Sequence, residues 1–148
     1  MRIFYLFIIS LLSLTACKTY SEDDKKNFDK QIRAYIRQHD LKCEKSASGL
    51  YYTIIKEGEG NKIQISDNVS ISYKGKLINC TTFDYQKKPV TFAVKDLIGG
   101  WKEMLLKSKP GAKIFMILPP HLGYGDNDLD DIPKNSILIF DMEIKSVE

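Results

Sequence analysis

The sequence predicts an α+β fold, in which one short helix covers an antiparallel β-sheet and a second helix precedes the sheet. Three observations lead to this prediction. Apolar residues alternate with a period of two in five runs after Leu50, which is typical of half-buried strands. Most connections between neighbouring runs are too short for parallel crossovers. One segment among them, around Trp101, has helical spacing instead.

Residues 1–16 have the layout of a cleaved signal peptide. Arg2 precedes an apolar run from Ile3 to Leu12, which is too short to span a bilayer comfortably and is followed by small residues. The sequence LTAC at 14–17 resembles a bacterial lipobox, and this resemblance implies cleavage before Cys17 and acylation of that cysteine. The alternatives are an ordinary signal peptide or a short anchor helix. Acylation would anchor the protein by lipid in the bacterial cell envelope, facing the periplasm or the cell surface.

Residues 17–47 are expected to form a lipid-anchored tether and an N-terminal helix. The stretch after Cys17 is polar and charged, as linkers are. An apolar residue recurs with helical spacing at Phe28, Ile32 and Ile36, which predicts a helix over about residues 23–39 with one apolar stripe. That stripe can dock on the rest of the chain or on a partner.

The five predicted strands are runs of β-branched and aromatic residues bounded by turn residues. They cover residues 51–56, 69–77, 90–94, 113–119 and 137–144. In the second run Val69, Ile71 and Tyr73 share one face, opposite serine and lysine side chains. This alternation predicts one buried and one solvated face, as antiparallel sheets have.

The predicted helix after Gly99 and Gly100 ends before the sequence KPG at 109–111. A bent sheet with one central helix can leave an apolar hollow between them. Trp101, on the first turn, would form its floor, while the two glycines keep its rim free of side chains. A backbone N–H near Ile98 lacks an intrahelical partner and is able to donate to a carbonyl in the hollow. The alternative is that Trp101 is a core residue only.

These segments, in this order, resemble the FK506-binding-protein (FKBP) type of peptidyl-prolyl isomerase over residues 48–148. The matching pieces are SGLYYTIIKEGEG (48–60), VSISYKGKL (69–77), FD (83–84), LIGGWKEML (97–105), GAKIFMILPPHLGYG (111–125), IP (132–133) and LIFDMEI (138–144). The resemblance implies a sheet of five or six antiparallel strands wrapped around one short α-helix, with the active site in the hollow. It also implies isomerisation of X-Pro bonds in folding envelope or surface proteins, with no cofactor and no metal.

The resemblance carries ten pocket residues over to this sequence. The implied catalytic residues are Tyr73, Phe83, Asp84, Ile98, Trp101 and Tyr124, and the implied substrate-binding residues are Val90, Leu97, Ile132 and Phe140. The Ile98 N–H and the Tyr124 hydroxyl are expected to bind substrate carbonyls. Asp84 is expected to orient the pocket through a hydrogen bond with Tyr73.

The sequence departs from the family pattern beside Asp84. The segment from there to Pro89 is shorter than in many members, and either Lys87 or Lys88 is a candidate for the basic partner of the aspartate. Val90 replaces an aromatic residue of the pocket wall. These departures keep a second function open, namely a binding module that holds proline-containing segments with little turnover.

Other classes of function are not indicated. Basic and acidic side chains number 22 and 19, and the basic ones are scattered, so nucleic-acid binding is not expected. Asp126, Asp128 and Asp130 alternate, but Asp131 and Ile137 occupy the glycine and glutamate positions of an EF-hand, which excludes that calcium loop. Nothing in the sequence specifies an oligomeric state.

Two cysteines remain besides Cys17. In a compartment where disulfides persist, Cys43 and Cys80 could form a bridge that pins the N-terminal segment to the domain. By the resemblance, Cys80 occupies a hairpin position where the family usually has glycine. The alternative is two unpaired thiols.

Overall fold

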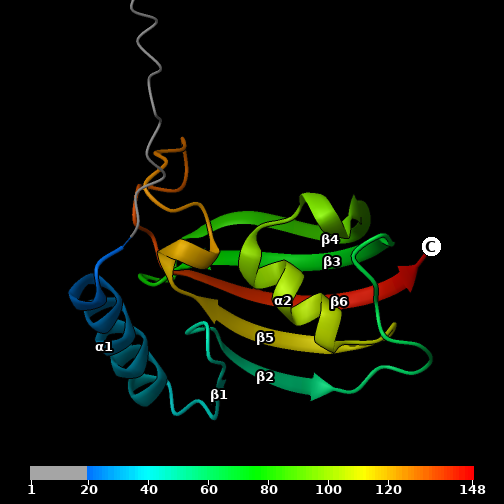
Figure 1. The fold of residues 1–148 in the computed structure, drawn as a ribbon, viewed down its shortest axis with the longest axis horizontal. Coiled ribbons are helices and arrows are strands. Elements are labelled where there is room, and N and C mark those ends of the chain that lie inside the picture. The colour runs from blue at the N-terminus through cyan, green and yellow to red at the C-terminus, as the bar shows by residue number, and fades with distance from the viewer. Residues whose placement is uncertain (1–19) are drawn as a thin grey trace, which may run out of the picture.

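The computed structural model describes residues 20–148, which form one folded unit (Figure 1). The predicted signal peptide and the predicted lipidation site, Cys17, lie outside the described residues. Within residues 20–148, no helix combines the length and the apolar character needed to cross a membrane.

Six strands form one antiparallel sheet in the order β1-β2-β5-β6-β3-β4, which confirms the predicted fold class. Their bounds are β1 Glu44–Lys45, β2 Tyr51–Lys56, β3 Asn68–Leu77, β4 Thr82–Ala93, β5 Lys113–Leu118 and β6 Leu138–Val147. The sequence did not predict β1, because two exposed residues offer no alternation. It predicted only the end of β4, because most residues from Thr82 to Pro89 are exposed and polar.

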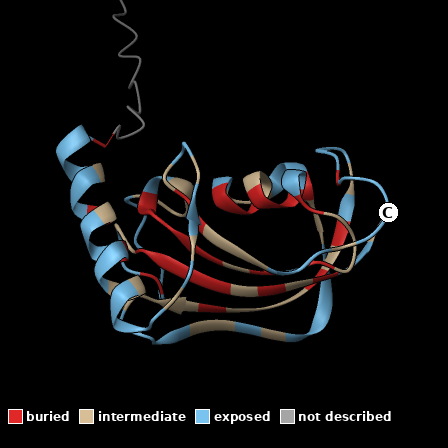
Figure 2. Ribbon diagram, turned by 90° about the horizontal axis from the view of Figure 1, so that it is seen from below, coloured by how far each residue is buried: buried red, intermediate tan, exposed pale blue. Residues whose placement is uncertain are grey.

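Helix α2 (Gly99–Lys107) lies across one face of the sheet, and the sheet curves beneath it (Figures 1 and 2). Trp101, Met104 and Leu105 are buried on the side of α2 that faces the strands. They pack in one core with side chains of the central strands, among them Met116 of β5 and Phe140 of β6. The short 3-10 helix η1 (Val94–Asp96) brings the chain from β4 to α2.

Helix α1 (Glu22–Gln38) docks on the opposite face, at one end of the sheet (Figure 1). Its buried residues Phe28 and Ile32 pack with Ile117 and Ile139, which are paired across β5 and β6. Successive strand residues point to opposite faces, so these two isoleucines lie behind the core beneath α2. The apolar stripe of α1 therefore covers its own domain, which was one of the two alternatives that the sequence left open.

Polar contacts cap the N-terminus of α1 and join the middle of the helix to β2. Ser21 begins the helix with a capping box, in which its hydroxyl accepts from the Asp24 N–H at 3.1 Å. Asp29 accepts from Arg33 at 2.8 Å and from the Tyr51 hydroxyl of β2 at 2.6 Å. Partial burial raises the pKa of Asp29, but hydrogen bonds from Lys45 and Tyr51 outweigh it and hold the pKa below its ordinary value.

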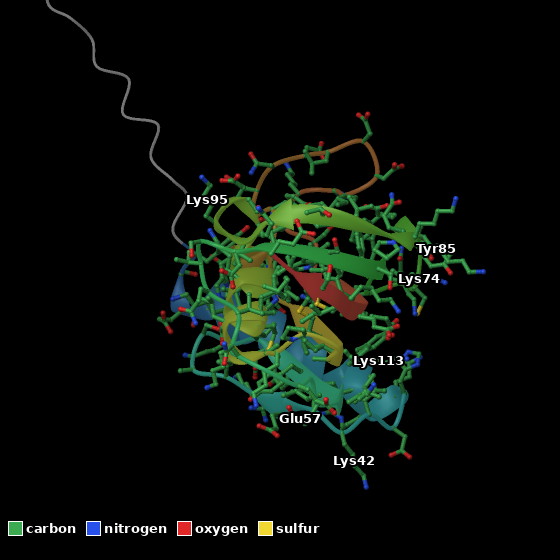
Figure 3. The ribbon with its side chains drawn as sticks, turned by 90° about the vertical axis from the view of Figure 1, so that its right-hand side faces the viewer. Lys42, Glu57, Lys74, Tyr85, Lys95 and Lys113 are labelled. Atoms are coloured by element: carbon green, nitrogen blue, oxygen red, sulfur yellow. The ribbon has the colours of Figure 1, made fainter. Side chains whose placement is uncertain are left out.

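The face of the sheet away from α2 is solvated where α1 does not cover it. Figure 3 shows Lys74, Tyr85 and Lys113 projecting from this outer face, whereas Lys95 lies on the side of α2. Lys74 and Tyr85 are cross-strand partners on β3 and β4, and the Lys74 ammonium lies 5.8 Å from the centroid of the Tyr85 ring. This half of the outer face therefore combines lysines with an exposed aromatic ring.

The structure does not form the bridge suggested between Cys43 and Cys80, and both thiols are free. The Cys43 sulfur accepts from the Thr53 hydroxyl of β2 at 3.7 Å, whereas the Cys80 sulfur lies 3.9 Å from the Tyr35 hydroxyl of α1. The two thiols thus face different neighbours. Cys80 has φ of 70°, a conformation that favours glycine.

The two glycines before Trp101 have different surroundings, and only one of them is at the rim. Gly99 is exposed, and a Cβ built there would lie 3.6 Å from the Leu122 side chain, an ordinary contact. Gly100 is buried, and a Cβ there would lie 2.4 Å from Cδ2 of Leu118 in β5. Gly100 therefore sets how closely α2 approaches the sheet, a role that the sequence did not predict for it.

We expect Gly100→Ala to lower the free energy of unfolding by about 1–3 kcal/mol, because the added methyl group overpacks the contact between α2 and β5. Gly99→Ala is the matched control and should be neutral or slightly stabilising, since alanine is the better helix former. Urea unfolding followed by circular dichroism measures both. Equal destabilisation by the two variants would contradict the close approach at Gly100.

Candidate active site

A pocket of about 190 Å³ opens between the N-terminal end of α2 and the sheet. The residues that line it are Tyr73, Phe83, Asp84, Phe92, Asp96, Leu97, Ile98, Trp101, Tyr124 and Phe140. They come from β3, β4, β6, η1, the start of α2 and the loop after the 3-10 helix η2 (Pro120–Leu122). Eight of the ten residues implied by the family resemblance are among them, and the structure brings these eight together.

The floor of the pocket is the indole of Trp101, held in place by aromatic rings. Trp101 is 4% exposed and stands on the first turn of α2. Three rings meet it in T-shaped contacts, with centroid distances of 4.9 Å to Tyr73, 6.0 Å to Phe92 and 5.2 Å to Phe140. Edge-to-face packing is the favoured geometry for such rings, so the floor is apolar and firmly positioned.

The carboxylate of Asp84 accepts hydrogen bonds at both of its oxygens. The Tyr73 hydroxyl donates to Oδ2 at 2.5 Å, and Nε2 of Gln86 donates to Oδ1 at 3.2 Å. The bond to Tyr73 is the one expected from the resemblance. The second donor is the neutral Gln86, whereas the sequence had suggested Lys87 or Lys88.

The hydroxyl of Tyr73 is held in its protonated form. Burial, the hydrogen bond to Asp84 and the charge of Asp84 all raise the pKa of Tyr73 far above its ordinary value. A tyrosine with such a raised pKa remains a hydrogen-bond donor throughout the physiological pH range. The Tyr73 hydroxyl is therefore able to donate to Asp84 near neutral pH.

Besides the buried indole N–H of Trp101, two hydrogen-bond donors at the pocket have no partner within residues 20–148. The Tyr124 hydroxyl is partly buried and makes no hydrogen bond with any residue from 20 to 148, and burial followed by the charge of Asp84 raises its pKa. Ile98 is the N-cap residue of α2, and its backbone N–H likewise donates to no group in the described part of the chain. Both donors are thus available to carbonyl oxygens of a bound ligand.

Two residues implied by the resemblance do not line the pocket. Val90 is 36% exposed and lies away from it. Val90 pairs with Ile71, whereas Tyr73 pairs with Gln86, so β4 has a bulge directly beside Val90. Ile132 is buried in the main core instead.

Two lining residues were not predicted as site residues. Phe92 forms the aromatic wall that Val90 was expected to complete, and its even spacing from Val90 on the strand was the available signal. Asp96 ends η1 and is exposed at the pocket. No sequence pattern marks it, because a polar residue just before a helix is common in any fold.

The pocket lies between a curved sheet and one helix, and most of its lining side chains are aromatic or aliphatic. Residues 59–145 match the family model for FKBP-type peptidyl-prolyl cis-trans isomerases. The chain belongs to this family.

Several bacterial proteins are similar to the chain. FkpA of Buchnera aphidicola subsp. Schizaphis graminum is 49% identical over 135 residues, which cover 87% of this chain and 53% of the relative. FkpA of Escherichia coli K12 is 40% identical over 106 residues, covering 70% and 39%. Mip of Coxiella burnetii is 40% identical over 106 residues, covering 69% and 46%. The chain thus spans about half, or less, of the length of these curated relatives.

Two crystal structures share the fold. FkpA from Escherichia coli superposes with a TM-score of 0.74 at 35% identity, covering 85% of this chain and 61% of that one. A peptidyl-prolyl cis-trans isomerase from Pseudomonas syringae pv. tomato superposes with a TM-score of 0.71 at 25% identity, covering 88% and 98%.

Proposed function

We propose that this protein is a peptidyl-prolyl cis-trans isomerase that accelerates rotation about X-Pro bonds in polypeptide substrates. The observation that carries the proposal is an aromatic pocket, floored by Trp101, in which the donors of Ile98 and Tyr124 have no partner among residues 20–148. The barrier to rotation is about 18–20 kcal/mol and arises from amide resonance, so no covalent bond has to break. Shape, dryness and a few hydrogen bonds are therefore sufficient for this chemistry.

The substrate proline packs against Trp101 in this proposal. The apolar walls strip water from the amide oxygen and so disfavour the charge-separated resonance form that keeps the bond planar. The Ile98 N–H and the Tyr124 hydroxyl hold carbonyl groups on the two sides of the proline. A pocket that fits the twisted amide better than either planar isomer lowers the barrier.

Asp84 acts as a positioning residue, because rotation requires no proton transfer. Both of its oxygens accept hydrogen bonds, from Tyr73 and from Gln86. The bond to Tyr73 fixes the ring that packs edge-to-face on Trp101. Asp84 thereby holds the aromatic floor in the shape that the twisted amide needs.

Loss of the floor or of its support should lower catalysis. We expect Trp101→Ala and Asp84→Ala each to reduce kcat/KM for proline tetrapeptides about tenfold or more, since each removes stabilisation of the twisted amide. Tyr85→Ala, an aromatic residue 57% exposed on the outer face, is the matched control and should leave the rate unchanged. The assay uses residues 18–148, which contain the whole folded unit.

The same assay separates the isomerase from a binding module. A folded wild-type protein that binds proline peptides without accelerating their isomerisation would contradict catalysis and make the chain a binding module. Equal isomerisation rates for the wild type and all three variants would show that isomerisation does not depend on this pocket.

We further propose that residues 1–16 are removed as a signal peptide and that Cys17 carries a lipid anchor. The apolar run before LTAC supports this. Tyr20, three positions after Cys17, is buried in the fold, so the folded domain would begin close to the anchor. The anchor would then hold α1 close to the membrane surface, and the clients would be proteins of the bacterial cell envelope. The polar stretch would act as a tether only before Tyr20.

Intact-mass measurement of the mature protein tests the proposed lipid anchor. When the full chain is expressed in a bacterial host, the mature protein should begin at Cys17, carry acyl groups and partition into detergent. Cys17→Ser should abolish acylation while leaving the isomerase rate of the folded unit unchanged. An N-terminus at another residue, or an unmodified Cys17 in the mature wild-type protein, would contradict the anchor.

A further inference from the structure

We propose that the pocket selects substrates with a basic residue next to the proline. This inference rests on the proposed function, because it concerns the substrate class of the same site. Its starting point is the charge of the lining residues: two of them, Asp84 and Asp96, are carboxylates, and in the described chain none of the lining residues is basic. The pocket is therefore apolar inside and negatively charged at its edge.

Neither of the two carboxylates forms an ion pair with a residue between 20 and 148. Asp84 is hydrogen-bonded by the neutral donors Tyr73 and Gln86. Asp96 is exposed, and its side chain forms neither an ion pair nor a hydrogen bond with any described residue. The charge of Asp96 is thus free to act on a bound substrate.

Two lysines near Asp96 in the chain, Lys95 and Lys102, do not line the pocket. Lys95 precedes Asp96, and Figure 3 shows it on the α2 side of the molecule, at the periphery. The Lys102 ammonium lies 3.5 Å from the carbonyl oxygen of Lys95, not beside the carboxylate of Asp96.

A second group of carboxylates follows the pocket wall at Tyr124. The loop after Gly125 carries exposed aspartates at positions 126, 128, 130 and 131, none of which forms an ion pair in the described chain. The Asp128 carboxylate accepts only the Lys134 backbone N–H, at 3.3 Å. Charges act over about 10 Å at 0.1 M ionic strength, so a longer substrate that leaves the pocket on this side passes through a negative potential.

The position of Asp96 determines which part of a substrate it contacts. With the proline ring on Trp101, the neighbouring residues extend outward over the rim, where Asp96 is exposed. A lysine or arginine there gains an ion pair, and a glutamate is repelled. Because the contact is exposed, we expect a discrimination of about fivefold between lysine and glutamate rather than an absolute requirement.

Peptide binding measured through Trp101 tests the inference without requiring turnover. Trp101 is the one tryptophan of the sequence, so its fluorescence reports occupancy of the pocket directly. Two series of tetrapeptides carry lysine, glutamine or glutamate, one series before the proline and one after it. At low ionic strength we expect the lysine peptide of at least one series to bind about fivefold more tightly than its glutamate counterpart.

Asp96→Asn should reduce this lysine-to-glutamate ratio, and so should 0.5 M NaCl, because screening weakens exposed charge pairs. Asp40→Asn is the matched control, since Asp40 follows α1, does not line the pocket and has φ of 49°, which asparagine tolerates. It should leave the ratio unchanged.

Equal affinities within both series, or a ratio that Asp96→Asn does not alter, would overturn the inference. These outcomes differ from failure of the proposed function. Charge-selective peptide binding without isomerisation would refute the isomerase activity and support the selectivity. Isomerisation with equal affinities for the lysine and glutamate peptides would support the activity and refute the selectivity.

Discussion

The packing of Trp101 between α2 and the sheet is the interaction on which the rest of the structure depends. Three aromatic rings from β3, β4 and β6 meet the indole edge-to-face, at centroid distances between 4.9 and 6.0 Å. The helix reaches this depth because Gly100 has no side chain to separate it from Leu118. Since the helix begins at this point, its first turn also presents the free N–H of Ile98 beside the indole. One packing arrangement thus creates both the apolar floor and a polar group that can bind a peptide.

The two faces of the sheet pack against different helices. One face and α2 form the pocket, while α1 covers part of the other face through Phe28 and Ile32. Asp29 joins α1 to β2 through Tyr51, so the N-terminal helix is part of the same folded unit as the pocket. Tyr20 is tied to the loop after Gly125 by a hydrogen bond of 2.7 Å to Asn135. An anchor at Cys17 would therefore act on the domain through α1 and through the loop that follows Tyr124.

Most of the fold and most of the pocket could be predicted from the sequence, because they depend on periodicity and on residue order. Alternation identified the half-buried strands, and the order of motifs identified Tyr73, Asp84, Trp101 and Tyr124. The site features that the sequence did not predict depend on strand register and on which side chains surround a residue in the fold. Phe92 lines the pocket and Val90 does not, although the two have the same parity on β4, and the bulge between Gln86 and Val90 is visible only in the pairing with β3. The second donor to Asp84, besides Tyr73, is Gln86 rather than a lysine, and no sequence pattern marks Asp96. The thiols of Cys43 and Cys80 are free because each faces other side chains.

The most direct test of the account is an NMR titration of residues 18–148, labelled with 15N, using a short peptide that contains a Leu-Pro bond. We expect the backbone amide of Ile98 and the indole N–H of Trp101 to show the largest chemical-shift changes, and we expect these changes to be smaller in Asp84→Ala. The outer face provides the contrasting site, since a groove of about 380 Å³ there is lined by Lys74, Tyr85 and Lys113. Shift changes centred on those three residues, with Ile98 and Trp101 unaffected, would contradict the claim that proline binds on Trp101.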